Sequence, residues 1–261
     1  MKPDRPLRVP DLVEKKRCRE KIVMLTAYDA TMARLFDRAG VDALLVGDSL
    51  GMVIMGQENT LGVTLDIMVH HTRSVTRGAR RALVVADMPF LTYQTGVNEA
   101  VRNAGRLIQE GGAAAVKLEG GHANVEVVAR LAEVGIPVMG HLGVTPQSVH
   151  KQGGHRRLGA KAAEKLVDEA LVLERAGAFA VVLESIPAPA AKAITEALTI
   201  PTIGIGAGPH CDGQVLVSYD VLGLFDEFVP SFVKRYAEMG DEVTRAARTF
   251  GDDVREGRFP K

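Results

Sequence analysis

Five apolar stretches of the sequence contain or end in ionisable side chains. The stretches and these residues are 44–46 with Asp48, 83–86 with Asp87, 114–118 with Lys117 and Glu119, 137–140 with His141, and 180–183 with Glu184. Such apolar runs are typical of parallel strands buried on both faces. The C-terminal ends of the strands of a closed parallel barrel meet on one face, where the active sites of that fold lie. We therefore expect these side chains to form one site.

Three of these residues are acids that suit a metal ion. In a partly buried site Asp48, Asp87 and Glu119 repel one another unless a cation or protons neutralise them. Ligands that are all oxygen favour Mg²⁺ or another hard cation over zinc. Each acid alone could instead cap a helix or form a turn. Their position at successive strand ends favours the metal site.

The other three residues suit substrate binding and proton transfer. Lys117 lies two residues from Glu119 on one strand, so both point to the same side of the sheet. It could form a structural ion pair, or it could hold a substrate carboxylate or an oxyanion. His141 could donate to an oxygen or move a proton, or be a satisfied core residue. Glu184 could act as a general acid or base, or it could instead cap the following helix.

Two glycine-rich segments add weaker signals. The segment 203–208 resembles the turns that bind phosphate in many barrels, and close backbone packing at the rim explains it equally well. The segment between Asp48 and a helix expected over 64–77 is longer than most connections. We expect it to form a lid or a wall of the substrate site.

The elements that must position these residues alternate along the chain. Strands are expected to begin near residues 22, 44, 82, 113, 137, 179, 201 and 215, with helices between them. Eight such units close a (β/α)8 TIM barrel, here a single α/β domain. An open doubly wound sheet would need a glycine fingerprint at its first turn, and residues 26–29 do not supply one.

The two ends of the chain are expected to lie outside the alternating units. Residues 1–21 read as an N-terminal leader and a short helix that closes the bottom of the barrel. Residues 22–261 then form the barrel together with a C-terminal helical segment. A helix is expected over 232–250, and it should pack on the barrel or on a neighbouring subunit.

Composition narrows the classes of partner. The chain has 261 residues, and Lys plus Arg equals Asp plus Glu at 32 each, which does not favour nucleic acid or an anionic membrane. No apolar leader or membrane-spanning run is evident, so the cytoplasm is the expected location. Cys18 and Cys211 show neither zinc spacing nor a disulfide framework.

Several segments together resemble the ketopantoate hydroxymethyltransferase family. The matching segments are 26–29, 46–51, 86–90, 116–121, 140–148 and 203–208. The resemblance implies a (β/α)8 barrel that transfers a one-carbon unit from 5,10-methylenetetrahydrofolate to 3-methyl-2-oxobutanoate, giving 2-dehydropantoate for pantothenate synthesis. It also implies a homo-oligomer, commonly a decamer.

The resemblance assigns a role to each candidate residue. By the family pattern Asp48, Asp87 and Glu119 surround Mg²⁺, and Ser49, Asp87 and Lys117 contact the oxo acid. Glu184 is the expected catalytic acid or base, and His141 and Tyr28 fall on substrate-site positions. The chemistry agrees with these roles, because a metal that binds the keto and carboxylate oxygens stabilises an enolate and a carboxylate base then suffices.

Two competing interpretations remain at this point. A phosphoenolpyruvate-mutase or isocitrate-lyase type barrel also uses magnesium and a 2-oxo acid. Such enzymes typically place a reactive cysteine near the site, and none is expected there in this chain. A catalytically inactive, metabolite-binding barrel would lack one or more of Asp48, Asp87, Lys117, Glu119 and Glu184, and all are present.

Overall fold

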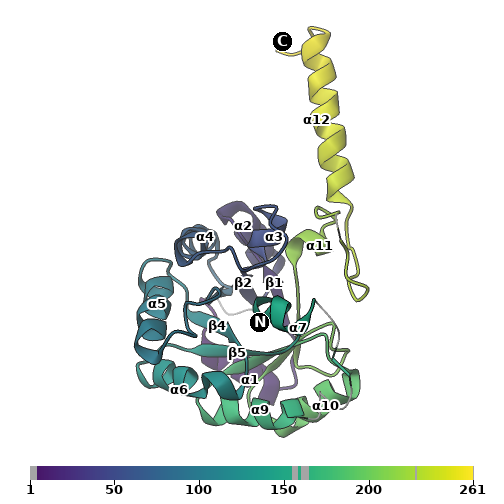
Figure 1. Cartoon of the computed structure of the whole chain (residues 1–261). Coiled ribbons are helices and arrows are strands. Elements are labelled where there is room, and N and C mark those ends of the chain that lie inside the picture. Colours follow the sequence, from purple (N-terminus) through teal and green to yellow (C-terminus); the bar gives the residue numbers. More distant parts are fainter. Residues whose placement is uncertain (1–4, 155–157, 160–164, 227, 261) are drawn as a thin grey trace. The chain divides into compact units, whose positions relative to one another are not determined.

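Eight parallel strands form a closed barrel in the order of the sequence (Figure 1). The computed structural model describes residues 5–154, 158–159, 165–226 and 228–260. The strands are β1 Ile22–Thr26, β2 Ala43–Val46, β3 Leu83–Asp87, β4 Ala115–Glu119, β5 Val138–Gly143, β6 Ala180–Glu184, β7 Thr202–Ile205 and β8 Gly213–Leu216. The (β/α)8 barrel predicted from the sequence is confirmed, and each predicted strand start lies within two residues of the observed one.

Helices in the connections between the strands surround the barrel (Figure 1), and further helices precede and follow the barrel in the chain. Their bounds are α1 Val9–Arg17, α2 Ala30–Ala39, α3 Leu50–Val53, α4 Leu65–Gly78, α5 Val97–Gln109, α6 Val125–Glu133, α7 Val149–Gln152, α9 Lys165–Arg175, α10 Ala188–Ala197, α11 Ser218–Val221 and α12 Met239–Arg255, with 3₁₀ turns η1 His122–Asn124 and η2 Pro146–Ser148. Every residue of β2, β3 and β4 is buried, as expected for strands covered on both faces.

Local signals set the ends of these helices. The side chain of Asp29 accepts hydrogen bonds from the backbone N–H groups of Thr31 and Met32 and so caps the start of α2. Gly40 ends α2 in the left-handed conformation at φ +87°. β2 follows almost at once, so α2 returns the chain to the bottom of the barrel with a short connection.

The described part of the N-terminal segment, residues 5–21, packs against the bottom of the barrel. Leu7 and Leu12 belong to the same buried cluster as the inward residues of the strands, such as Met24 and Val85. The Leu7 N–H donates to the Arg81 carbonyl, which lies just before β3.

Lysines at and after α1 hold this segment in place. Lys16 Nζ lies 2.9 Å from Asp212 Oδ2 and donates to the Thr195 carbonyl. Lys21 Nζ donates to the Cys211 carbonyl at 2.6 Å. Asp212 and Cys211 immediately precede β8, so these contacts fix the segment at the N-terminal ends of the strands.

The glycine-rich segment after Asp48 contains an element that the sequence did not predict. One turn of helix, α3, follows Ser49 directly, and the Gln57 N–H donates back to the Gly51 carbonyl at 2.8 Å. A Cβ on Gly51 would lie 2.7 Å from Val63 Cγ2, so a larger residue there would force Val63 to shift. The helix expected over 64–77 is confirmed as α4.

The chain divides into two compact units, residues 1–215 and 216–261, with β8 ending at their border. The predicted division into 1–21 and 22–261 stays a prediction. In the second unit the helix expected over 232–250 is wrong in extent, because α12 spans Met239–Arg255. The backbone N–H groups of Tyr236 and Met239 donate to the carbonyls of Val221 and Leu222 instead of to a helix of their own.

No helix among the described residues is long and apolar enough to cross a membrane.

Candidate active site

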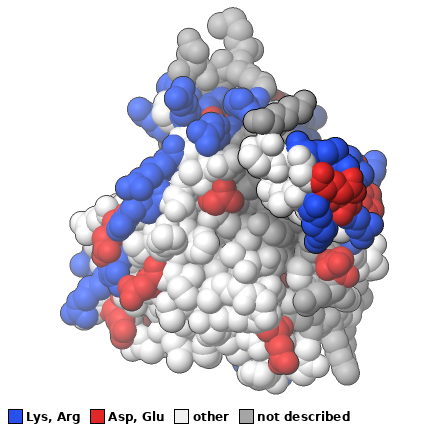
Figure 2. Space-filling view, turned by 90° about the horizontal axis from the view of Figure 1, so that it is seen from above, with Lys and Arg blue, Asp and Glu red and all other residues white. Residues whose placement is uncertain are grey.

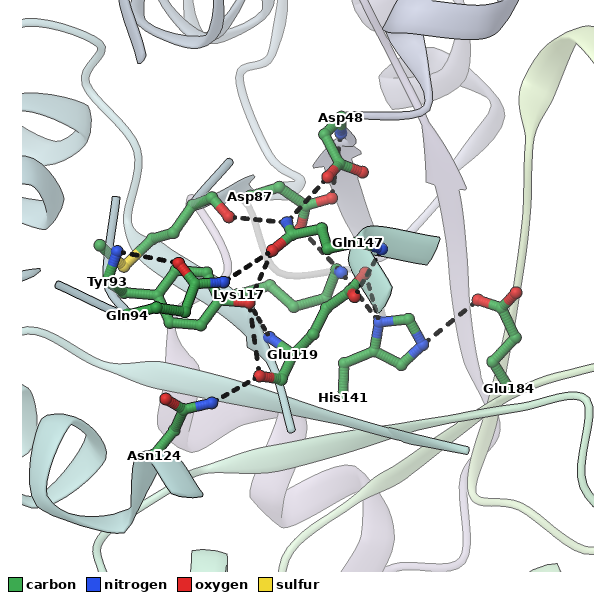
Figure 3. Close-up of polar contacts among 11 residues, drawn as sticks. Asp48, Asp87, Tyr93, Gln94, Lys117, Glu119, Asn124, His141, Gln147 and Glu184 are labelled. Carbon is green, nitrogen blue, oxygen red and sulfur yellow. Dashed lines mark hydrogen bonds and ion pairs between the residues drawn. The ribbon is translucent and has the colours of Figure 1, made fainter. Parts of the chain in front are cut away.

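Strand register brings the predicted residues together. Asp87 of β3 is the register partner of Lys117 of β4, and Glu119 of β4 is the partner of His141 of β5. Register partners of a parallel sheet point to the same side, as do residues two apart on one strand. All four side chains are between 3% and 5% exposed, and they converge in one cluster (Figure 3).

Lys117 and Asp87 form the buried ion pair of this cluster. Lys117 Nζ lies 2.9 Å from Asp87 Oδ1. Burial opposes the charge on Lys117, but the carboxylates of Asp87, Glu119 and Asp48 outweigh burial and raise the pKa of Lys117 above its usual range. Lys117 is therefore a permanent cation among acids.

Asp48 adds a second carboxylate next to Asp87. The backbone N–H of Asp48 donates to Asp87 Oδ2 at 3.1 Å. Burial, followed by repulsion from Asp87 and Glu119, raises the pKa of Asp48 to about 8. Burial also raises the pKa of Asp87, although the Lys117 ammonium counteracts it. One ammonium is too little positive charge to keep both carboxylates ionised at neutral pH.

Ser49 and Tyr28 lie beside this acid pair. Tyr28 Oη and Ser49 Oγ are hydrogen-bonded at 3.0 Å, and His71 Nδ1 lies 2.6 Å from the Tyr28 carbonyl oxygen. A Cβ on Gly47 would lie 2.7 Å from Ser49 Oγ and 3.6 Å from Asp87 Oδ2. The missing side chain of Gly47 thus lets the serine hydroxyl approach the acid.

His141 connects the two predicted glutamates. Its Nδ1 lies 3.5 Å from Glu119 Oε1, and its Nε2 lies 3.2 Å from Glu184 Oε2. Burial and the Lys117 ammonium oppose protonation of His141, but its bonds to the two glutamates outweigh them and raise its pKa to about 9. The Glu184 side chain is 19% exposed, whereas that of Glu119 is 4% exposed. Only Glu184 therefore combines contact with the cluster and access to solvent.

Glu119 stays ionised in spite of its burial. Burial raises its pKa, but the hydrogen bond and charge of His141, the charge of Lys117 and the Gln147 N–H together lower it below the ordinary value. Glu119 is thus a fixed negative charge at the end of β4.

Residues outside the strands complete the site, and reasoning from strand ends missed them. Gln147 of η2 donates from Nε2 to Asp48 Oδ2, and from its backbone N–H to Glu119 Oε2. Tyr93, in the connection after β3, donates to Gln147 Oε1 at 2.6 Å. Asn124 donates to the Glu119 carbonyl at 2.8 Å. Gln147 lies within the matching segment 140–148, and that was its only signal; Tyr93 and Asn124 gave none.

The carboxylates of the site fit only in part the arrangement that holds a hard divalent cation. Within the described residues no group of three His, Cys, Asp or Glu side chains is arranged to hold a metal ion. Mg²⁺ commonly takes one or two protein carboxylates and fills its other positions with water and substrate oxygens. Asp48 and Asp87 match that pattern, because they are adjacent and the single Lys117 ammonium does not neutralise both. Glu119 lies beside them and is engaged by Gln147 and His141.

The segment 203–208 is accounted for by close packing. A Cβ on Gly204 would lie 3.0 Å from Cys211 Sγ and 3.1 Å from the Gln214 amide. Gly208 has φ +82°, and a Cβ there would lie 2.5 Å from Ala188 Cβ of α10. Of the two interpretations of this segment, the structure favours backbone packing at the rim.

The fold and the site together define a class, a (β/α)8 barrel with carboxylates, a lysine and a histidine at its C-terminal mouth. Two similar solved structures are a phosphonopyruvate hydrolase in complex with oxalate and Mg²⁺, with TM-score 0.64, and a 2,3-dimethylmalate lyase of the PEP mutase/isocitrate lyase superfamily, with TM-score 0.62. They are 11% and 18% identical to this chain and cover 96% and 95% of it, and the alignments cover 88% of each of them. At these identities the likeness concerns the fold alone.

Sequence comparison narrows the class to one family. The profile of ketopantoate hydroxymethyltransferase matches residues 6–261. Proteins named 3-methyl-2-oxobutanoate hydroxymethyltransferase from Syntrophus aciditrophicus and Pelobacter propionicus are 57% and 54% identical, over 94% and 97% of this chain and 91% and 94% of their own lengths. The chain belongs to the ketopantoate hydroxymethyltransferase family, which confirms the resemblance seen in the sequence and leaves the phosphoenolpyruvate-mutase alternative unfavoured.

Proposed function

We propose that this enzyme transfers a hydroxymethyl group from 5,10-methylenetetrahydrofolate to C3 of 3-methyl-2-oxobutanoate and releases 2-dehydropantoate. The observation that carries the proposal is the convergence of Lys117, His141 and four carboxylates at consecutive strand ends, in a chain of this family. The reaction requires a fixed oxo acid, a group that removes the C3 proton, and compensation of the negative charge that then develops. The cluster supplies a candidate for each task.

A divalent cation, with Mg²⁺ as the first choice, would be held by Asp48 and Asp87 with Glu119 at its side. Burial raises the pKa of both Asp48 and Asp87, and the Asp87 charge raises that of Asp48 further, so a cation beside them would favour their ionised forms. When bound, the cation supplies positive charge that makes the carbon next to a keto group more acidic.

Lys117 and Ser49 would hold the oxo acid. Lys117 Nζ is held by Asp87 Oδ1 at 2.9 Å, and an ammonium has further N–H groups to offer. Such an N–H is suited to a substrate carboxylate or to the oxygen that becomes negative when C3 loses its proton. Ser49, tied to Tyr28, would fix the other end of the oxo acid.

Glu184 would remove the C3 proton. It contacts His141 Nε2 through Oε2, which leaves Oε1 for the substrate, and its partial exposure places it at the open side of the cluster. A protonated His141, with its pKa raised to about 9, forms an ion pair with Glu184 at 3.2 Å and holds it in place. The donor carries a methylene, so a water molecule must supply the hydroxyl oxygen of the product. As C3 and this oxygen bond to the methylene carbon, its two bonds to folate nitrogens break, and the proton taken up by Glu184 and one proton of the water go to these nitrogens.

The charge distribution on the molecular surface fits small-molecule substrates. It does not indicate a nucleic acid or a membrane as a partner. On the face in Figure 2, Lys and Arg lie close to Asp and Glu around a broad uncharged area instead of forming one basic field. We assign the enzyme to the cytoplasm, because Cys18 and Cys211 are both free thiols, which suits a reducing compartment.

We also propose that the enzyme works as a homo-oligomer, a decamer by family likeness. The helix α12 supports this, since it carries four apolar side chains at helical spacing that are between 40% and 57% exposed, Met239, Val243, Phe250 and Val254. In Figure 2, where α12 points towards the viewer, charged side chains cover one of its sides and uncharged ones the other. A second copy of the chain would cover this apolar stripe.

The test is exchange at C3. With purified enzyme and 3-methyl-2-oxobutanoate deuterated at C3, we expect Mg²⁺-dependent loss of deuterium by NMR, which EDTA stops. Addition of 5,10-methylenetetrahydrofolate should convert the same substrate to 2-dehydropantoate. Neither exchange nor product at saturating Mg²⁺ and substrate would contradict the proposed activity.

A further inference from the structure

Asp48, which follows β2, and Glu119, at the end of β4, share one partner that comes from outside the barrel strands. Gln147 lies on η2, after β5, and is 6% exposed. Its side-chain Nε2 donates to Asp48 Oδ2 at 2.8 Å, and its backbone N–H donates to Glu119 Oε2 at 3.0 Å. A single residue thus engages both carboxylates (Figure 3).

The side-chain amide of Gln147 uses its whole hydrogen-bonding capacity. One N–H goes to Asp48 Oδ2, and the other goes to the Met88 carbonyl at 3.0 Å. The oxygen accepts from Tyr93 Oη at 2.6 Å and from Gln94 Nε2 at 3.4 Å. Because a carbonyl can only accept, the Met88 contact fixes which end of the amide is nitrogen. The amide can therefore face Asp48 only as a donor.

Tyr93 anchors this orientation to β4. Tyr93 is 1% exposed, and its hydroxyl accepts the Glu119 backbone N–H at 3.2 Å. Its one proton goes to Gln147 Oε1, the shortest of its contacts. A chain of bonds therefore runs from the backbone of Glu119 through Tyr93 and Gln147 to the carboxylate of Asp48.

We propose that Gln147 is a positioning residue, which holds Asp48 and Glu119 in the orientation that binds a divalent cation. The inference rests on the proposed function, because it assumes a cation at these acids. By occupying Asp48 Oδ2, Gln147 leaves the other oxygen of that carboxylate for the cation. Groups that fix metal-binding side chains in this way typically change metal affinity by 10- to 100-fold when they are removed.

The experiment measures cation binding without turnover. Mn²⁺ is titrated into wild type, Gln147→Leu, Tyr93→Phe and the surface control Gln109→Leu at one pH, and free Mn²⁺ is followed by electron paramagnetic resonance. We expect Gln147→Leu to weaken binding about 10- to 100-fold. Tyr93→Phe should weaken it several-fold, since the amide loses its anchor, and Gln109→Leu should match wild type. At saturating cation, kcat of Gln147→Leu should recover to within a few-fold of wild type.

The outcomes separate the two proposals. Wild type that fails to bind Mn²⁺ would remove the cation site, and with it the role of Gln147. Wild type that binds while folded Gln147→Leu binds equally well would overturn the role of Gln147 alone. Circular dichroism and thermal melting report whether each variant folds. If Gln147→Leu does not fold, Tyr93→Phe decides, and wild-type affinity in that variant overturns the inference.

Discussion

Glu119 and Glu184 both contact His141, yet their surroundings differ enough to separate their roles. Glu119 is closed in by His141, Gln147 and Lys117, and these groups hold its pKa below the ordinary value. Glu184 touches the cluster through one oxygen and is the more exposed of the two. A proton acceptor needs a free oxygen that the substrate can reach, and Glu184 alone has one.

We predict that Glu184→Gln slows loss of the C3 deuterium by about 10²- to 10⁴-fold, the range typical of a lost general base. Binding of the oxo acid, measured by calorimetry, should stay within a few-fold, because Lys117 and Asp87 are unchanged. Glu196→Gln on the outer helix α10 is the control and should behave as wild type. Exchange at the wild-type rate in Glu184→Gln would remove it as the base.

A second prediction concerns Asp220 of α11. Burial raises its pKa to about 6, although the charge of Arg235 counteracts it. In the unfolded chain the same group titrates near the ordinary value of 3.8. Between those two values the folded state binds more protons, so stability falls as pH rises through this window and levels off above it.

Asp220→Asn should remove the loss of stability that wild type shows as the pH rises. Relative to wild type, we expect the variant to gain about 2 kcal/mol in unfolding free energy between pH 4 and pH 7.5, as urea titrations would show. Asp226→Asn, which changes an exposed acid of the same unit, should follow wild type. The same pH dependence in wild type and Asp220→Asn would refute the assignment.

Much of the site could be predicted because its residues follow strands. Asp87, Lys117, Glu119, His141 and Glu184 lie on or end apolar runs, and parallel register then forces neighbours such as Asp87 and Lys117 together. The roles assigned to these residues, and the metal assignment, stay predictions. Gln147 and Tyr93 lie in connections without periodicity, so nothing in their local sequence indicated that they meet.

At the scale of elements, the packing of α2 against α4 depends on one glycine. Gly78 ends α4, and a Cβ there would lie 2.2 Å from the carbonyl oxygen of Ala30 in α2. Backbone cannot move aside as a side chain can, so the two helices would have to separate. Gly105 of α5 offers the contrast, since a Cβ there would meet nothing within 4 Å.

We predict opposite effects of the same substitution at these two glycines. Gly78→Ala should destabilise the protein by about 2 kcal/mol or more, because it overpacks a helix contact. Gly105→Ala should stabilise it by about 0.5 to 1 kcal/mol, because alanine favours a helix interior. Urea denaturation of both variants measures the two changes. Effects of equal sign would show that crowding at Gly78 does not control this packing.

The extent of the C-terminal helix shows what pattern alone misses. Apolar spacing continues from Phe232 into α12, and this spacing suggested one helix over 232–250. In the structure the Arg235 guanidinium donates to the Phe225 carbonyl, and the Tyr236 N–H pairs with the carbonyl of Val221 at the end of α11. These non-local bonds replace helical ones before Met239, and no property of residues 232–238 by themselves reveals them.

At the scale of the whole molecule, the apolar stripe of α12 should decide assembly. We predict that Val243→Glu combined with Phe250→Glu lowers the mass in solution, measured by analytical ultracentrifugation, because two charges would enter an interface between copies. Arg248→Glu, on the charged side of the helix, is the control and should leave the mass unchanged. Wild type that sediments as a single chain, or a double variant with wild-type mass, would contradict the proposed oligomer.

The described part of the N-terminal segment closes one end of the barrel. Leu7 and Leu12 fill its lower end, so both reactants and both products must share the opposite opening. Whichever compound rests against the buried Lys117 has to enter before the one that covers it, and it has to leave afterwards. Because Lys117 is proposed to hold the oxo acid, we predict a compulsory order in the kinetics, with the oxo acid first in and its hydroxymethylated product last out.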